Sequence, residues 1–162
     1  MIVKHCLEPI YDEQSQVLIL GSIPSVKSRE LGFYYAHPQN RFWKVMQKVF
    51  DVELSTAEDK VNFLHQYHIA LYDVIEQCEI AGSSDASIKN VVPTNLVDII
   101  GKSKITKVYT TGKKAYDLYQ KYQYPKTNIQ AELLPSTSPA NAKCSLEDLI
   151  QVYENINKNC LS

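Results

Sequence analysis

Short apolar runs and stretches of helical periodicity alternate along the chain. Apolar runs, or alternating apolar and polar residues, predict strands over residues 17–20, 69–74, 105–111 and 129–134. Between and after these segments, apolar residues recur every three or four positions behind capping residues. These signals predict helices over residues 40–50, 55–66, 94–100, 112–122 and 145–157. Ser55 with Glu58, and Ser145 with Asp148, give two of the helices a capping-box start.

Strands that alternate with helices are typical of a parallel sheet covered on both faces. We therefore expect a three-layer α/β/α sandwich with a central, mostly parallel four-stranded sheet. No repeat or linker divides the sequence, so residues 1–162 are expected to form one domain. Ligands of such sheets bind beyond the carboxyl ends of the strands. Two loops rich in Ser, Pro and Asn, residues 21–40 and 135–143, would meet there.

Composition limits the class of protein. The 162 residues are 44% hydrophobic and 22% charged, close to globular averages, which argues against a disordered or fibrous chain. The longest apolar run, residues 17–20, is far shorter than the ~20 residues needed to cross a bilayer. The amino-terminal residues show no signal-peptide pattern. We expect a cytoplasmic protein without membrane contact.

The charge of the chain is nearly balanced, at −1, but it is unevenly distributed. Residues 27–48 contain five Lys or Arg residues and one Glu. A positive segment of this kind could bind phosphate, or it could be an ordinary solvated helix face.

The cysteines and histidines give no metal-site pattern. The four cysteines are scattered and form no Cys-x-x-Cys pair, so reduced structural thiols are expected. His65 and His68 stand three residues apart without neighbouring cysteine or carboxylate ligands. We expect neither a metal nor another cofactor.

The first loop contains the residue types of a nucleobase pocket. Tyr34 and Tyr35 offer ring faces for stacking a base, unless they pack in the core, and Arg41 offers a contact to phosphate. Phe42 and Trp43 fit the apolar face of the following helix and are expected in the core.

The second loop is rich in hydroxyl groups. Ser136, Thr137 and Ser138 could donate hydrogen bonds to a phosphate, and the rigid tip formed by Pro139 and Ala140 could enter a base stack. The alternative is a plain connector between strand and helix.

Taken in order, these motifs resemble the uracil-DNA glycosylase superfamily. The resemblance rests on Gly-Ser-Ile-Pro-Ser at 21–25, Tyr-Ala-His-Pro-Gln-Asn-Arg-Phe-Trp at 35–43 and Leu-Pro-Ser-Thr-Ser-Pro at 134–139. The Ala-His-Pro-x-Asn-Arg-Phe-Trp part is shared with mismatch-specific uracil glycosylases. Together with residues 71–75 and 82–85, the pattern is most similar to the DNA-deoxyinosine (hypoxanthine-DNA) glycosylase branch. The match covers nearly the whole chain from residue 17.

The resemblance implies a base-excision repair enzyme. Such an enzyme flips a deaminated base out of double- or single-stranded DNA and hydrolyses its N-glycosidic bond, here above all that of hypoxanthine. We expect a monomeric, monofunctional glycosylase, because no lysine is clearly placed to form a Schiff base. The alternatives are a uracil or mismatch glycosylase of the same fold and a noncatalytic nucleic-acid-binding module.

The resemblance also assigns roles to individual residues. Asn40 is the catalytic candidate, and His37 either contacts the leaving group or only shapes a turn with Pro38. Asp73 either anchors the loops or lines the pocket. The expected base-binding residues are Gly21, Ser22, Ile23, Pro24 and Tyr35, and the expected DNA-binding residues are Arg41, Ser136, Thr137, Ser138, Pro139, Ala140 and Asn141.

Two positions depart from the superfamily pattern. Ile23 stands where most members carry the Asn or Asp that orients water, and Leu134 stands where His or Asn often begins the second motif. An apolar side chain cannot orient water, so both departures argue against efficient uracil excision.

Overall fold

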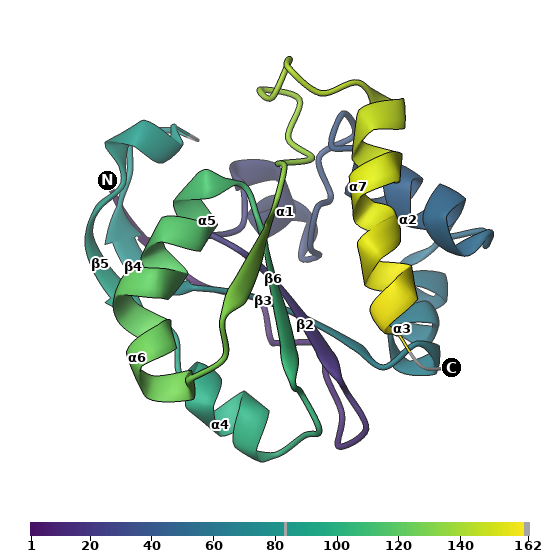
Figure 1. Ribbon diagram of the computed structural model, residues 1–162. Helices are drawn as coiled ribbons and strands as arrows, with labels where there is room; N and C mark the ends of the chain where they lie inside the picture. Colours follow the sequence, from purple (N-terminus) through teal and green to yellow (C-terminus); the bar gives the residue numbers. More distant parts are fainter. Residues whose placement is uncertain (83, 161–162) are drawn as a thin grey trace.

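A computed structural model describes residues 1–82 and 84–160. Four parallel strands form the centre of the protein (Figure 1). Their order is β3 (Ile69–Asp73), β2 (Val17–Gly21), β6 (Lys107–Thr111) and β7 (Ala131–Leu134). Every residue of β2 is buried, because a central parallel strand is covered on both faces. The predicted sheet is thus confirmed, with all four strands parallel.

Three helices cover one face of the sheet. They are α2 (Phe42–Phe50), α3 (Ala57–Gln66) and α7 (Leu146–Asn159), which lie to the right of the strands in Figure 1. Val17 and Ile19 of β2 point into this layer and share one hydrophobic cluster with Phe42, Trp43 and residues of α7. The expected core positions of Phe42 and Trp43 are therefore confirmed.

The other face is covered by α4 (Leu96–Gly101), α5 (Lys113–Leu118) and α6 (Tyr124–Thr127). A π-helical segment, Tyr119–Gln123, joins α5 to α6, so the helical region predicted over 112–122 continues to residue 127. Leu18 and Leu20, the alternate residues of β2, pack in this second cluster. Among the described residues, no helix combines the length and apolarity needed to span a membrane.

A second sheet was not predicted. It is antiparallel, in the order β1 (Ile2–Lys4), β4 (Ile75–Glu79), β5 (Lys89–Pro93). The strand predicted over 69–74 ends at Asp73, and β4 begins after the single residue Val74. The chain therefore passes directly from the central sheet into the small sheet. A 3-10 turn, η1 (Asp85–Ser87), lies in the connection between β4 and β5.

The first loop also contains an unpredicted helix, α1 (Val26–Leu31). The side chain of Ser25 accepts a hydrogen bond from the backbone N–H of Ser28 at its start, and Gly32 ends it in the left-handed conformation at φ 73°. Both are common helix-terminal signals. The helix has only six residues, which is too short for apolar periodicity to show.

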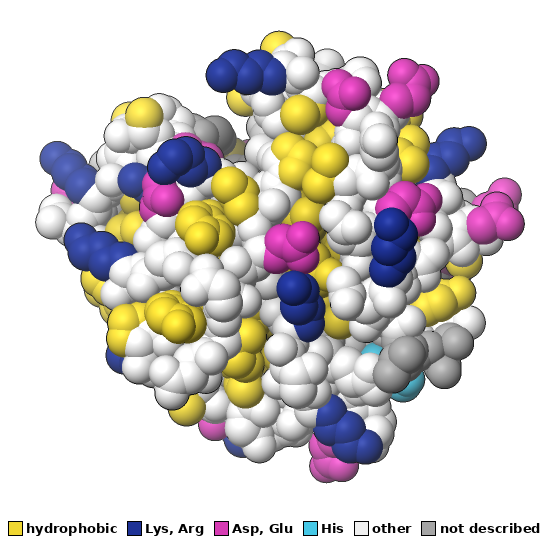
Figure 2. Space-filling view, in the orientation of Figure 1, with side chains coloured by type: hydrophobic (Ala, Val, Ile, Leu, Met, Phe, Trp, Pro, Cys, Tyr) yellow, Lys and Arg dark blue, Asp and Glu magenta, His cyan; other side chains and the backbone are white. Residues whose placement is uncertain are grey.

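Charged side chains of both signs are dispersed over the face shown in Figure 2. Ion pairs such as Lys107–Glu132, at 3.2 Å, place opposite charges side by side on neighbouring strands. This face of the molecule therefore carries no continuous positive surface of the kind that attracts nucleic acid.

The capping box of α3 lies one residue later than predicted. The hydroxyl of Thr56 accepts from the backbone N–H of Asp59, and the Asp59 carboxylate accepts from the backbone N–H of Thr56. Ser55 and Glu58 do not form this reciprocal pair. The box predicted for Ser145 and Asp148 at the start of α7 is confirmed.

Replacing Thr56 should therefore destabilise the fold, whereas replacing Ser55 should not. Thr56→Ala removes the cap and is expected to lower the free energy of unfolding by about 1 kcal/mol. Ser55→Ala, the matched control, should stay within about 0.5 kcal/mol of wild type, as is typical of exposed positions. Urea denaturation followed by circular dichroism measures both, and equal losses would contradict the assignment.

Candidate active site

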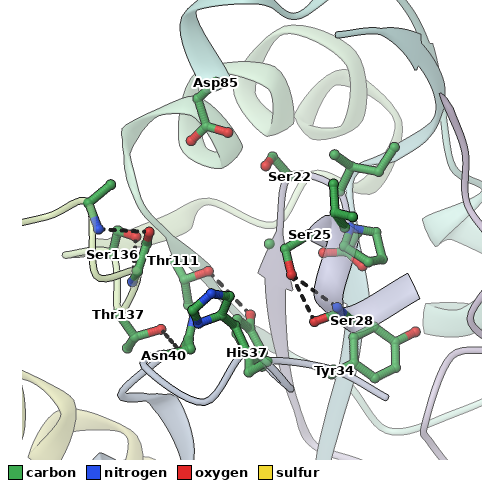
Figure 3. Close-up of a pocket in the computed structure, with 18 of the residues that line it drawn as sticks. Ser22, Ser25, Ser28, Tyr34, His37, Asn40, Asp85, Thr111, Ser136 and Thr137 are labelled. Atoms are coloured by element: carbon green, nitrogen blue, oxygen red, sulfur yellow. Dashed lines mark hydrogen bonds between the residues drawn. The ribbon is translucent and has the colours of Figure 1, made fainter. Parts of the chain in front are cut away.

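A pocket of about 670 Å³ opens at the carboxyl edge of the parallel sheet (Figure 3). This volume lies within the ~300–1,000 Å³ usual for small-molecule sites. Both predicted loops reach it, as expected for residues that follow parallel strands. Thirteen of the fourteen predicted site residues line it: Gly21, Ser22, Ile23, Pro24, Tyr35, His37, Asn40, Ser136, Thr137, Ser138, Pro139, Ala140 and Asn141.

The floor of the pocket is built around Gly21 and Asp73. A Cβ on Gly21 would lie 2.6 Å from Oδ1 of Asp73, so the carboxylate occupies space that only glycine leaves free. Oδ2 of Asp73 lies 2.7 Å from Nε2 of His5, whose side chain is 1% exposed. Nδ1 of His5 accepts a hydrogen bond from the backbone N–H of Leu7. Nε2 therefore carries the ring hydrogen and donates a hydrogen bond to Asp73. Asp73 therefore lines the pocket and also anchors the amino-terminal segment.

Tyr35 forms one wall, next to the floor. Its ring stacks on Phe42, with 4.0 Å between centroids and 12° between planes, and its hydroxyl lies 3.3 Å from Oγ1 of Thr111. Burial, helped by the nearby charge of Asp73, raises the pKa of Tyr35, so the hydroxyl stays protonated. Since Phe42 covers one ring face, at most the other face is free to stack on a base.

Tyr34 is a core residue that also borders the pocket. It is 4% exposed, its hydroxyl donates to the carbonyl of Glu8, and its own carbonyl accepts from the indole of Trp43. The core alternative considered for the tyrosine pair thus describes Tyr34 better than base stacking does.

The side-chain amide of Asn40 is fixed in orientation by two donors. Its Oδ1 accepts from the backbone N–H of Phe42 and from the hydroxyl of Thr137, each at 2.9 Å. A backbone N–H can only donate, so the atom facing it must be oxygen. Both lone pairs are thereby used, and the NH₂ group is what Asn40 offers to a ligand. Asn40 can donate a hydrogen bond but cannot take a proton from water.

His37 is both a turn residue and a pocket residue. Its carbonyl accepts from the backbone N–H of Asn40, and its Nδ1 accepts from the backbone N–H of Gln39. Nε2 therefore carries the ring proton. Figure 3 shows the ring beside Asn40 at the pocket. The pocket thus has two neighbouring hydrogen-bond donors on this side.

Arg41 contacts the second loop. Its Nη1 donates to the carbonyl of Cys144 at 2.6 Å, and its Nη2 donates to those of Ser138 and Asn141 at 3.0 Å. It does not line the pocket. Arg41 positions the second loop through these contacts, and its predicted contact with phosphate stays a prediction.

The other basic residues of 27–48 do not form one patch. Lys27 pairs with Glu30, Arg29 donates to the carbonyl of Pro24 and lines the pocket, and Lys44 and Lys48 are exposed on α2. For these two lysines, the solvated helix face is the better interpretation.

The second loop is held in shape by its own polar groups. The hydroxyl of Ser136 accepts from the backbone N–H of Ser138, and that of Ser138 accepts from the N–H of Ala140. Asn141 donates its side-chain amide to the carbonyl of Ser136. Neither serine donates its own O–H to another of the described residues, so both hydroxyls can donate to a ligand. Pro139 and Ala140 are exposed at the tip.

The sequence did not predict the third wall of the pocket. It comes from α1, through Ser28 and Arg29, and from the β4–β5 connection, through Gly82, Ser84 and Asp85. Residues 82–85 belonged to the motif set, but no chemistry was assigned to them. Desolvation raises the pKa of Asp85, and the charge of Lys114 opposes the rise.

The described residues contain no group of three or more His, Cys, Asp or Glu side chains that could hold a metal ion. The chemistry of the pocket as described therefore comes from amide, imidazole, hydroxyl and carboxylate groups.

Comparison with known proteins gives consistent matches. A family model described as the uracil DNA glycosylase superfamily matches residues 8–156. A protein named hypoxanthine DNA glycosylase from Methanosarcina acetivorans is 28% identical over 149 residues, covering 89% of this chain and 92% of its own length. One of the same name from Methanosarcina barkeri is 32% identical over 89 residues, covering 54% of this chain and 56% of its own length.

The fold is also found in a solved structure. The solution NMR structure of a Methanosarcina acetivorans protein, provisionally described as a uracil DNA glycosylase, superposes with a TM-score of 0.80 at 27% identity. The match covers 97% of this chain and 99% of that one.

Replacing Arg41 should loosen the second loop. Arg41→Lys cannot reproduce the three-carbonyl contact of the guanidinium. Hydrogen bonds from charged groups contribute ~1.5–3 kcal/mol each, so losing one should speed amide exchange in residues 138–144 by at least about 10-fold. Hydrogen-exchange mass spectrometry measures this, with Lys44→Arg as the control. Unchanged exchange, together with a weaker salt dependence of DNA binding, would instead support the phosphate contact.

Proposed function

The chain belongs to the uracil DNA glycosylase superfamily and is a DNA glycosylase; we propose that its substrate is deoxyinosine in DNA, from which it releases hypoxanthine. Two relatives named hypoxanthine DNA glycosylase support this substrate, one of them matched over nearly its whole length. The apolar Ile23 in the pocket lining supports it too, because that side chain cannot supply the water-orienting group that most uracil-excising members carry.

The fixed amide of Asn40 is the observation that carries the proposal. When the glycosidic bond breaks, negative charge develops on the purine, whose N3, N7, N9 and O6 atoms are then hydrogen-bond acceptors. Asn40 presents only N–H donors, and His37 presents its Nε2 proton beside it. Donors placed in advance where charge develops stabilise a transition state without reorganising. We assign Asn40, with His37, to the departing hypoxanthine.

Extrusion of the nucleotide must come before this chemistry, because a stacked base cannot enter the pocket. The cost of extrusion is a few kcal/mol and is smallest for mispaired bases such as hypoxanthine. The exposed tip at Pro139 and Ala140 is suited to filling the vacated space. The hydroxyls of Ser136 and Ser138, which accept but do not donate hydrogen bonds within the loop, are suited to binding phosphate.

Hydrolysis completes the reaction. Water adds to C1′ of the deoxyribose, the C1′–N9 bond breaks and its electron pair leaves with the base. No lysine is among the described residues that line the pocket, so no amine is in place to attack C1′. The proposed enzyme is therefore monofunctional and leaves an abasic site in an unbroken strand.

A panel of oligonucleotides tests the substrate. Duplexes and single strands containing inosine, uracil or mismatched thymine are incubated with the protein, with adenine as the undamaged control. Inosine should react fastest and give free hypoxanthine, and the strand should break only after alkali. Faster release of uracil would select a uracil glycosylase, whereas tight binding without release would select a noncatalytic module. Breakage without alkali, with borohydride trapping, would contradict the monofunctional assignment.

Replacing Asn40 should slow excision without preventing DNA binding. Asn40→Ala removes one positioned donor, which typically costs ~10²-fold in rate. Single-turnover release of hypoxanthine measures the effect. Asn62→Ala, which removes an exposed amide on α3, is the matched control and should react at the wild-type rate. A folded Asn40→Ala protein with near-normal turnover would remove Asn40 from the mechanism.

A further inference from the structure

The hydrogen-bond donors Asn40 and His37 do not explain how the attacking water loses its proton. Attack by water on C1′ requires an acceptor for the proton that the water loses. Asn40 has no free lone pair, and Nδ1 of His37 is occupied by the N–H of Gln39. Ile23 is apolar. None of these three residues can accept the proton.

Two carboxylates are among the described residues that line the pocket, those of Asp73 and Asp85. Asp73 is at the floor, and its side chain is 6% exposed, accepts a hydrogen bond from Nε2–H of His5 and packs against Gly21. A carboxylate that is this deeply buried and already engaged by His5 has little room beside it for a water molecule. Asp73 is therefore placed to contact the base edge and not the water.

Asp85 is placed differently. It begins the turn η1 and is exposed at the rim, where the sugar and backbone of an extruded nucleotide must remain. Figure 3 shows its carboxylate directed toward the pocket, on the wall across from Asn40 and Thr137. No hydrogen bond or ion pair to this carboxylate is found among the described residues, in contrast to Asp73. Its oxygens are thus available to a water molecule.

We propose that Asp85 is the general base of the reaction, acting on the water that attacks C1′. This inference rests on the glycosylase function proposed above. As the C1′–N9 bond breaks, the water oxygen bonds to C1′ and one water proton passes to the Asp85 carboxylate. The electron pair of the broken bond leaves on the base, which Asn40 and His37 stabilise. The proton then passes from Asp85 to the released purine anion or to solvent, and the residue is restored.

The surroundings of Asp85 suit this role. Although the residue as a whole is exposed, the protein around the pocket desolvates its carboxylate enough to raise the pKa above that of an ordinary aspartate, and the charge of Lys114 limits the rise. Arg29 and His37 line the same pocket. A raised pKa makes a carboxylate a stronger proton acceptor. Lys114 also favours an approaching phosphate, which would otherwise be repelled by the carboxylate.

Asp85→Asn tests the assignment with little change of shape. General base catalysis contributes ~10²–10⁴-fold, so single-turnover release should fall at least about 10²-fold, with DNA affinity within about 3-fold of wild type. The substrate is whichever base the wild type releases fastest. Asp98→Asn, which removes an exposed carboxylate of α4 outside the pocket, is the control. Asp85→Gly adds a second readout, because formate should restore part of its lost rate.

The outcomes separate this inference from the proposed substrate. If the wild type prefers uracil, the hypoxanthine assignment fails and Asp85 is tested on uracil DNA. If Asp85→Asn retains a rate within about 3-fold of wild type, the general-base role is overturned whatever the substrate. A slow variant that also binds DNA poorly, or that formate does not rescue, assigns Asp85 to loop structure and overturns the role too. Failure of the wild type to release any base overturns both.

Discussion

The site depends on one hydrogen bond between side chains that are 97 residues apart, from the hydroxyl of Thr137 to Oδ1 of Asn40. This bond joins the loop after the first parallel strand to the loop after the last. Arg41, next along the chain, adds three bonds to carbonyls of the same second loop. Together these contacts fix the distance across the pocket and the direction of the Asn40 amide. Binding and chemistry therefore share a single structural support.

The layers of the fold could be predicted because their signal is local. A buried parallel strand reads as an apolar run, and a helix on one of its faces reads as a period of three or four residues. The small sheet lacks such a signal: β1 has three residues, and β5 is largely exposed. Its pairing joins Ile2 to Glu79, a contact between distant segments that no local pattern contains. For the same reason, α1 was not predicted and the cap of α3 was predicted one residue too early.

The site could be predicted as a set of residues but not as a set of interactions. Motif order and the geometry of parallel sheets bring both loops to one edge, and thirteen of the named residues do line one pocket. Residue type did not reveal that Arg41 would bind backbone carbonyls or that Asn40 would be left as a donor alone. His5 was missed for the same reason. It contacts Asp73, which is 68 residues away in the sequence. Nothing in the local sequence around a histidine near the amino terminus indicates which residue it contacts in the fold.

The pairing of His5 with Asp73 makes the first residues of the chain part of the catalytic cavity. Trimming the amino terminus past this position would leave a hole beside Asp73 and a carboxylate without its histidine partner, even if the rest folded normally. The same segment continues from the edge strand β1, which pairs with β4, so the amino-terminal residues support both sheets.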